Sequence, residues 1–95
     1  MFILHVDIVL KPNSWENLSR TYRDKFVPAI STQAGFVNTM LLRPVEKGEF
    51  DNRLVIEFES HETQQAWVAT DVHQQVWPEM EASIKEYAVH SFEAQ

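Results

Sequence analysis

The feature that most constrains this chain is the order in which two hydrophobic periods alternate along it. Apolar residues at every second position predict β-strands, and apolar residues three and four apart predict helices. Strand-type segments are residues 2–10, 36–43, 53–60 and 87–92, and helix-type segments are residues 15–27 and 61–85. We therefore predict the order β-α-β-β-α-β, a ferredoxin-like α+β fold in which helices cover one face of an antiparallel sheet.

Residues with special backbone preferences mark the ends of these segments. Asn13 or Ser14 is placed to cap the first helix, and Pro28 is expected to kink or end it near Val27. Gly35 predicts a tight turn into the second strand. The second helical region is expected to break near residues 70–71 and begin again there.

The length of the chain predicts one domain, residues 1–95, that gains stability by pairing. Hydrophobic residues make up 44% of the 95, which is typical of a folded protein. A single chain this short can bury only a small hydrophobic core. We expect one sheet face to be bare and a second copy to cover it, giving a homodimer with a shared β-barrel. The residues assigned to that bare face are Phe2, Leu4, Val6, Ile8, Leu54, Ile56 and Phe58.

Charge and composition narrow the kinds of ligand. A net charge of −6 argues against nucleic acid and anionic membranes, and no apolar run is long enough to span a bilayer. The absence of cysteine excludes thiolate chemistry and makes the cytoplasm the expected compartment. The two glycines form no phosphate loop, and the four histidines have no metal-ligand spacing. We expect no metal, no cofactor, and a small aromatic or apolar metabolite as ligand.

Two polar residues on the first strand are candidates for binding and catalysis. His5 and Asp7 share one strand face, and they would point into a cavity if that face lies under the helices. Desolvation would then raise the pKa of Asp7 and suit it to act as a general base, with His5 binding substrate. An ion pair with Arg43 or Arg53, or exposure to solvent, are the alternatives.

The helical regions supply the other candidates. Trp67, His73 and Trp77 fall on consecutive turns, so an indole pair around an imidazole would wall a flat aromatic ligand. His73 is a candidate acid or base near pH 7, and Tyr22 adds a phenolic donor from the first helix. Simple packing against the sheet is the competing interpretation for each of these side chains.

Three groups of residues, in this order, resemble a known family. The first strand ends at Lys11-Pro12; Gln33-Ala34-Gly35-Phe36-Val37 leads into Leu41-Leu42-Arg43-Pro44; and Phe58-Glu59-Ser60-His61-Glu62 precedes Ala66-Trp67 and Thr70-Asp71-Val72-His73. Over almost the whole chain the pattern resembles the antibiotic-biosynthesis-monooxygenase-like (ABM) proteins of the dimeric α/β-barrel superfamily. That family includes cofactor-free oxygenases of aromatic polyketides, haem-degrading enzymes, and isomerases of signal molecules.

The resemblance also suggests which positions to compare. Haem-degrading members have an Asn on the first strand, a Trp in the second helical region and a His ten residues later; the matching positions look like Asp7, Trp67 and Trp77. An indole cannot ligate iron. The polyketide oxygenases have a Trp at the position of Trp67 and a Tyr where His73 stands.

The leading hypothesis is a cofactor-independent monooxygenase of a small phenol, hydroquinone or anthrone. His73 or Asp7 would remove a substrate proton so that the anion can pass an electron to O₂. Trp67 would stack on the ring or donate to the oxyanion, while Trp77 and Tyr22 exclude water. The alternatives are a non-catalytic dimeric module that binds a small molecule, and a haem-binding protein that uses a ligand such as His73.

Overall fold

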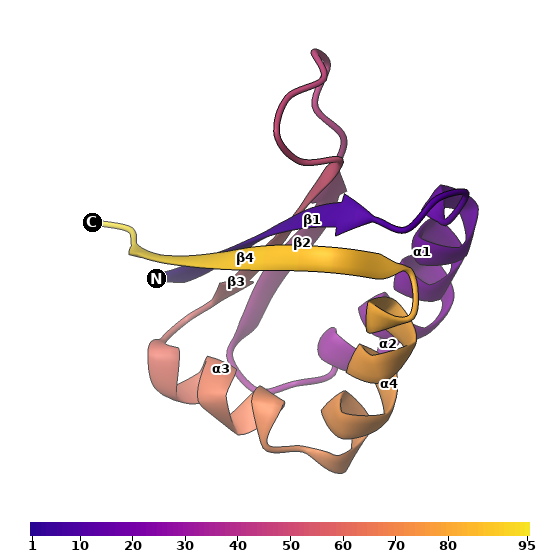
Figure 1. The fold of residues 1–95 in the computed structure, drawn as a ribbon. Coiled ribbons are helices and arrows are strands. Elements are labelled where there is room, and N and C mark those ends of the chain that lie inside the picture. The colour runs from indigo at the N-terminus through magenta and orange to yellow at the C-terminus, as the bar shows by residue number, and fades with distance from the viewer.

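The computed structural model describes all residues from Met1 to Gln95 as a four-stranded sheet with helical segments between the strands (Figure 1). The strands are β1 (Phe2–Leu10), β2 (Phe36–Leu42), β3 (Asn52–Phe58) and β4 (Ile84–Glu93). The helical segments are α1 (Trp15–Thr21), the π-helical turn η1 (Tyr22–Phe26), α2 (Val27–Ile30), α3 (His61–Val68) and α4 (Asp71–Glu81). The predicted order β-α-β-β-α-β is confirmed, with each helical region divided into shorter segments.

The sheet brings the two ends of the chain together. Its strand order is β2-β3-β1-β4, and every neighbouring pair is antiparallel. Phe2 lies opposite Phe58 on one side and Glu93 on the other, so β1 is central. The N-terminus and the C-terminus therefore lie side by side (Figure 1), and the backbone N–H of Ala94 donates to the Met1 carbonyl at 2.9 Å.

The helices cover the opposite sheet face from the one we predicted. The face expected to be bare, which carries Val6, Ile8 and Leu54, is buried in the core under the helices. The open face carries the alternate residues of β1 and β3, including Asp7 and Arg53. This arrangement follows from polarity, because the helices bury the face on which β1 and β3 carry no charged side chain, while Asp7 and Arg53 stay on the open face.

The first helical region continues past Pro28, which was expected to kink or end it near Val27, and it is irregular just before that proline. Pro28 lies in the first turn of α2, and the helix runs on to Ile30. Directly before it, η1 widens to a π-helical turn in which the Val27 N–H donates to the carbonyl of Tyr22. Proline has no N–H and cannot donate the hydrogen bond of a regular α-helix. A single π-helical turn before Pro28 therefore lets the chain continue as a helix into α2.

The second helical region breaks where the sequence indicated. Ser60 caps α3, and its side chain and that of Thr63 form a reciprocal capping box. The helix ends at Val68, and the side chain of Thr70 caps α4 by accepting a hydrogen bond from the backbone N–H of His73 at 3.2 Å. No helix of the structure is long and apolar enough to cross a membrane.

The turn at Gly35 joins the first helical region to β2 and lies directly against Thr63 of α3. Gly35 has φ of +78°, a left-handed conformation that side chains disfavour. A Cβ atom at this position would lie 2.6 Å from the Thr63 side chain. The predicted tight turn is thus confirmed, and a glycine is required both by the backbone and by the contact with α3.

Candidate active site in the helix–sheet cleft

A cleft of about 310 Å³ lies between helices α3 and α4 and strands β1 and β4. Nine of its eleven lining residues are hydrophobic, and none is an acid, a lysine or an arginine. The enclosed end is formed by Val6, Ile56, Phe26 and Trp67, with Leu4, Val68 and Gln64 beside them, and the exposed end by Trp77, Tyr87 and Val89. His73 also lines the cleft and is its one imidazole. Such a lining suits a neutral, flat, apolar ligand.

Aromatic rings form a continuous wall along the cleft. The Phe26 and Trp67 rings meet edge to face with centroids 6.0 Å apart, and Trp67 in turn lies edge-on to His73 at 5.0 Å. On its other side His73 stacks on Trp77, which meets the ring of Tyr87 edge to face at 5.7 Å. The structure therefore brings together three of the candidate residues, Trp67, His73 and Trp77.

His73 is the residue in the cleft with unused hydrogen-bonding capacity. Its ring is half-buried, and its Nδ1 atom is enclosed without any hydrogen-bond partner. Burial lowers the pKa of His73 below its ordinary value, and the negative charge of Glu81 opposes this shift. The imidazole is therefore neutral at pH 7, the form in which one ring nitrogen can accept a proton.

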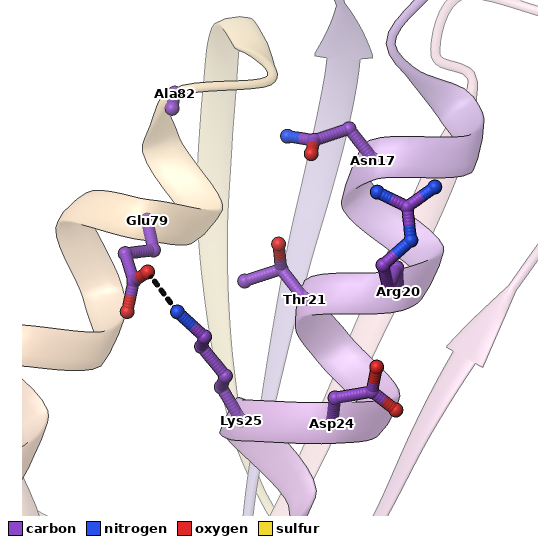
Figure 2. A pocket seen from close by; sticks show the side chains of 7 residues that line it. All are labelled: Asn17, Arg20, Thr21, Asp24, Lys25, Glu79 and Ala82. Carbon is purple, nitrogen blue, oxygen red and sulfur yellow. Dashed lines mark hydrogen bonds and ion pairs between the residues drawn. The ribbon is translucent and has the colours of Figure 1, made fainter.

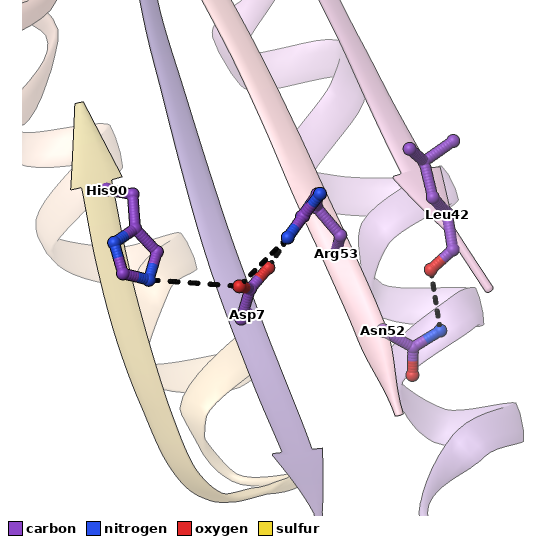
Figure 3. Close-up of polar contacts among 5 residues, drawn as sticks. All are labelled: Asp7, Leu42, Asn52, Arg53 and His90. Atoms are coloured by element: carbon purple, nitrogen blue, oxygen red, sulfur yellow. Dashed lines mark hydrogen bonds and ion pairs between the residues drawn. The ribbon is translucent and has the colours of Figure 1, made fainter. Parts of the chain in front are cut away.

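Asp7 and His5 lie together, but on the opposite face of the sheet from the cleft. Figure 3 shows Asp7 on β1 between Arg53 of β3 and His90 of β4. The Nε and Nη2 atoms of Arg53 donate to the two Asp7 carboxylate oxygens at 2.7 and 3.1 Å, and His90 Nε2 is 3.8 Å from Oδ2.

The ion pair with Arg53 decides whether Asp7 has a raised pKa, is ion-paired or is exposed to solvent. The hydrogen bonds from Arg53 lower the pKa of Asp7, although desolvation alone would raise it. Burial and the nearby Arg53 lower the pKa of His5. The raised pKa expected for Asp7 is thus wrong, and the ion pair with Arg53 is the alternative that the structure contains.

Tyr22 lies outside the cleft, behind one of its walls. Its ring stacks on Phe26 with centroids 5.8 Å apart, and its hydroxyl is 3.5 Å from Thr39 Oγ1 on β2. Burial raises the pKa of the Tyr22 hydroxyl. Because its ring stacks on Phe26, Tyr22 supports that wall of the cleft from the side of β2.

Sequence reasoning named as site residues only Trp67, His73 and Trp77 of the eleven residues that line the cleft, and Gln64 and Phe26 are among those it missed. Gln64 is 6% exposed and lies three residues before Trp67, so both side chains share one face of α3. Phe26 is 1% exposed and enters the cleft from η1. The helical spacing from Trp67 was the signal that could have identified Gln64; nothing in the sequence linked Phe26 to α3.

A second hollow, between α1 and α4, is polar. Figure 2 shows it lined by Asn17, Arg20, Thr21, Asp24, Lys25, Glu79 and Ala82. Lys25 and Glu79 form an ion pair across it. Its two acids and two bases leave no net charge, and nothing in it resembles a nucleophile with an adjacent base. The helix–sheet cleft is therefore the better candidate for chemistry.

Comparison with solved structures places this geometry among known folds. No protein-family profile matches the chain, and no curated protein matches it in sequence. A proposed antibiotic biosynthesis monooxygenase from Caulobacter crescentus matches with a TM-score of 0.85 and 12% identity, over 99% of this chain and 89% of that one. Another from Nitrosomonas europaea matches with a TM-score of 0.82 and 13% identity, over 99% and 98%.

A haem-degrading protein has the same fold. MhuD from Mycobacterium tuberculosis, solved with two haems bound in its active site, matches with a TM-score of 0.77 and 23% identity, over 99% of this chain and 95% of that one. Identities this low establish shared architecture and leave the reaction open. The chain has the ferredoxin-like fold of the antibiotic-biosynthesis-monooxygenase-like proteins.

Proposed function

We propose that this protein is a cofactor-independent monooxygenase that acts on a small phenol, hydroquinone or anthrone bound in the helix–sheet cleft. The observation that carries the proposal is the neutral imidazole of His73, whose enclosed Nδ1 has no partner in a cleft lined by aromatic rings. The likeness to structures described as antibiotic biosynthesis monooxygenases supports it.

His73 acts as the base in this reaction. It removes a proton from the activated C–H or O–H group of the substrate, and the resulting anion passes an electron to O₂. For an anthrone, one oxygen atom replaces the two hydrogens of the CH₂ group to form a carbonyl, and the other oxygen atom leaves as water with those hydrogens. The proposal no longer uses Asp7 or His5, because both lie across the sheet from the cleft.

The tryptophans hold the ring and exclude water. Trp67 is 2% exposed and forms part of the enclosed end, where we propose that it packs on the substrate or donates its indole N–H to the developing oxyanion. Trp77 is half-buried and stacks on His73. Removing water at this place protects the substrate anion from reprotonation.

Oxygen uptake by the purified, metal-free protein tests this function. We expect consumption above autoxidation with anthrones or dihydroxynaphthalenes, and loss of it in His73→Ala. His61→Ala is the matched control, since this imidazole lies on the exposed first turn of α3 outside the cleft. Uptake equal to the buffer across the panel, or full activity in His73→Ala, would exclude the reaction.

A non-catalytic binding module is the competing proposal from the same cleft. In that case the same aromatic compounds raise the thermal midpoint of the protein without any oxygen uptake. Trp77→Ala would weaken this stabilisation, and His73→Ala would change it little. The two proposals therefore differ in turnover and in their dependence on His73.

Haem binding is the third candidate, because MhuD shares the fold and His73 offers an imidazole in an aromatic cleft. The other residues do not fit this group well. Haem carries two propionates, and no lysine or arginine lines the cleft to pair with them. Trp77 cannot ligate iron. Titration with haemin tests the candidate directly, since binding through His73 would shift the Soret band and His73→Ala would abolish the shift.

We also propose that two copies pair through the open face of the sheet. That face exposes Met40, Leu42 and Phe92, each 40–48% accessible, around the Asp7–Arg53 ion pair. A second copy would remove these apolar side chains from water and leave the carboxylate and guanidinium paired. The proposed homodimer thus uses the face opposite to the one first assigned.

A further inference from the structure

A groove of about 450 Å³ lies at the edge strand β2, where α1 and η1 pack beside it. Its lining residues are Trp15, Ser19, Tyr22, Arg23, Leu41 and Arg43. The helical residues are three or four positions apart and so share one face. Leu41 lies near the end of β2 and Arg43 directly follows the strand, and both line the same groove. None of these residues except Tyr22 has a part in the cleft described above, and Tyr22 only supports its wall.

Arg43 is positioned in this groove without a charged partner. Its Cζ atom lies 4.4 Å from the centroid of the Trp15 ring, so the guanidinium stacks on the indole. None of the ion pairs in the structure includes Arg43. Stacking holds the guanidinium plane in place and leaves its N–H groups at the edge available for a planar acceptor.

The electrostatics of the groove differ from those of the whole chain. The chain has a net charge of −6, yet the groove contains two arginines and no acid. Arg23 forms one ion pair, with the exposed Asp24 next to it, and its Nε is 3.5 Å from Oδ1. An anion that is repelled elsewhere on this surface would find two guanidinium groups here.

The rest of the lining is suited to an aromatic ring. Leu41 and Tyr22 are both half-buried and provide apolar surface between the arginines and the sheet, and Ser19 adds one hydroxyl. A bare inorganic anion would leave this apolar surface unused. A flat ring with one carboxylate would cover it while its two oxygens meet the fork of Arg43.

We propose that the groove between α1 and β2 binds a small aromatic carboxylate through Arg43 stacked on Trp15. The carboxylate pairs with the guanidinium of Arg43, Arg23 adds a second positive charge, and the ring lies against Leu41. This site is separate from the helix–sheet cleft and does not depend on the reaction proposed there.

NMR titration of the full chain with sodium benzoate tests the site, with benzamide as the neutral compound of the same shape. We expect saturable shifts at the backbone amides of residues 15–23 and 41–43, and binding of benzamide weaker by tenfold or more. Arg43→Gln should weaken benzoate binding by a similar factor. Arg20→Gln is the matched control, because it also removes one positive charge but Arg20 lines the polar hollow between α1 and α4 instead of this groove. We expect Arg20→Gln to change the affinity for benzoate less than twofold.

Arg43→Lys tests whether the guanidinium of Arg43 binds the carboxylate or only packs on Trp15. It keeps the charge and replaces the planar fork, so we expect most of the benzoate affinity to be lost while the dispersion of the spectrum is retained. This variant also decides the matter if Arg43→Gln does not fold. Equal shifts with benzoate and benzamide, equal affinity for inorganic phosphate, shifts confined to residues 64–77 of the cleft, or unchanged affinity in Arg43→Lys would each overturn the proposal.

Discussion

The imidazole of His73 and the indole of Trp77 lie almost parallel, 13° apart, with their ring centroids separated by 6.3 Å. Both residues are on α4, four positions apart, so one helix holds them in register. On its other side His73 meets the edge of Trp67. This arrangement encloses Nδ1 and keeps the imidazole neutral, which has measurable consequences for stability as well as for chemistry.

Stability should fall as the pH drops from about 7 to about 5, partly because of His73. Burial lowers the pKa of His73 in the folded protein, so the unfolded chain takes up this proton first, below its ordinary value of 6.5. Stability from a neutral His73 is therefore present above that pH and is lost as the pH falls toward the lowered pKa. Urea unfolding of wild type and His73→Gln at several pH values measures this, and parallel curves would contradict it.

Asp7→Asn should lower the free energy of unfolding without affecting the cleft. The substitution removes the charge that accepts two hydrogen bonds from Arg53, which we expect to cost about 1–2 kcal/mol at pH 7. Because Arg53 lowers the pKa of Asp7, this contribution is present above about pH 4 and is lost in more acidic solution.

Glu57→Gln is the control for Asp7→Asn, since Glu57 is on the same sheet face and makes no ion pair. Denaturant unfolding compares the two variants, and oxygen uptake or ligand binding is measured alongside. Loss of turnover in folded Asp7→Asn would show that the open face takes part in the reaction, contrary to the structure.

Substitutions of the two tryptophans of the cleft should affect the free energy of unfolding and ligand binding to different degrees. Trp67 is 2% exposed, and Trp67→Ala should cost about 3–5 kcal/mol because it leaves a cavity in the core. Trp77 is only half-buried at the exposed end of the cleft, so Trp77→Ala should cost less stability but weaken binding of aromatic compounds. Denaturant unfolding and ligand-induced thermal shifts are the measurements; equal losses of stability would mean that Trp77 is simply core.

The two glycines should respond very differently to the same change. Gly35→Ala forces a side chain into a left-handed backbone and against Thr63, and should cost about 1–3 kcal/mol. Gly48 has no atom within 4 Å of an added Cβ, so Gly48→Ala should stay within about 0.5 kcal/mol of wild type. Thermal unfolding of the pair decides, and similar midpoints would show that the Gly35 turn relaxes without cost.

The proposed pairing of two copies should depend on the open face of the sheet. Light scattering is expected to give twice the 11.1 kDa of one chain for wild type. Met40→Glu and Phe92→Glu place a charge in the proposed interface and should give single chains. Val45→Glu, at a fully exposed residue between β2 and β3, is the control and should leave the mass unchanged. Dimers that persist in both open-face variants would rule out this interface.

The order of elements could be read from the sequence, but the choice of sheet face could not. In β1 the alternate positions on both sides include apolar residues, for instance Ile3 and Val9 beside His5 and Asp7, so the period alone leaves the buried side open. The choice becomes clear only once Asp7 is seen opposite Arg53 on β3, because a paired charge is then available on one side.

The candidate site was predictable where it lies on one local segment. Trp67, His73 and Trp77 were identified from their spacing in the second helical region, and they do meet, since the break at residue 70 leaves both helices facing the sheet. Phe26 could not be placed with them, because that contact depends on how η1 packs across forty residues of intervening chain. The ion pair of Asp7 was foreseen only as one alternative for the same reason.

The central position of β1 has a consequence for how this protein is made. β1 leaves the ribosome before both of its partners, because β3 begins at Asn52 and β4 at Ile84. The cleft takes Leu4 and Val6 from the first strand and Tyr87 and Val89 from the last one. A nascent chain in which β4 has not yet paired with β1 lacks one wall of the cleft, so the proposed ligand site forms only when the first and the fourth strand have come together.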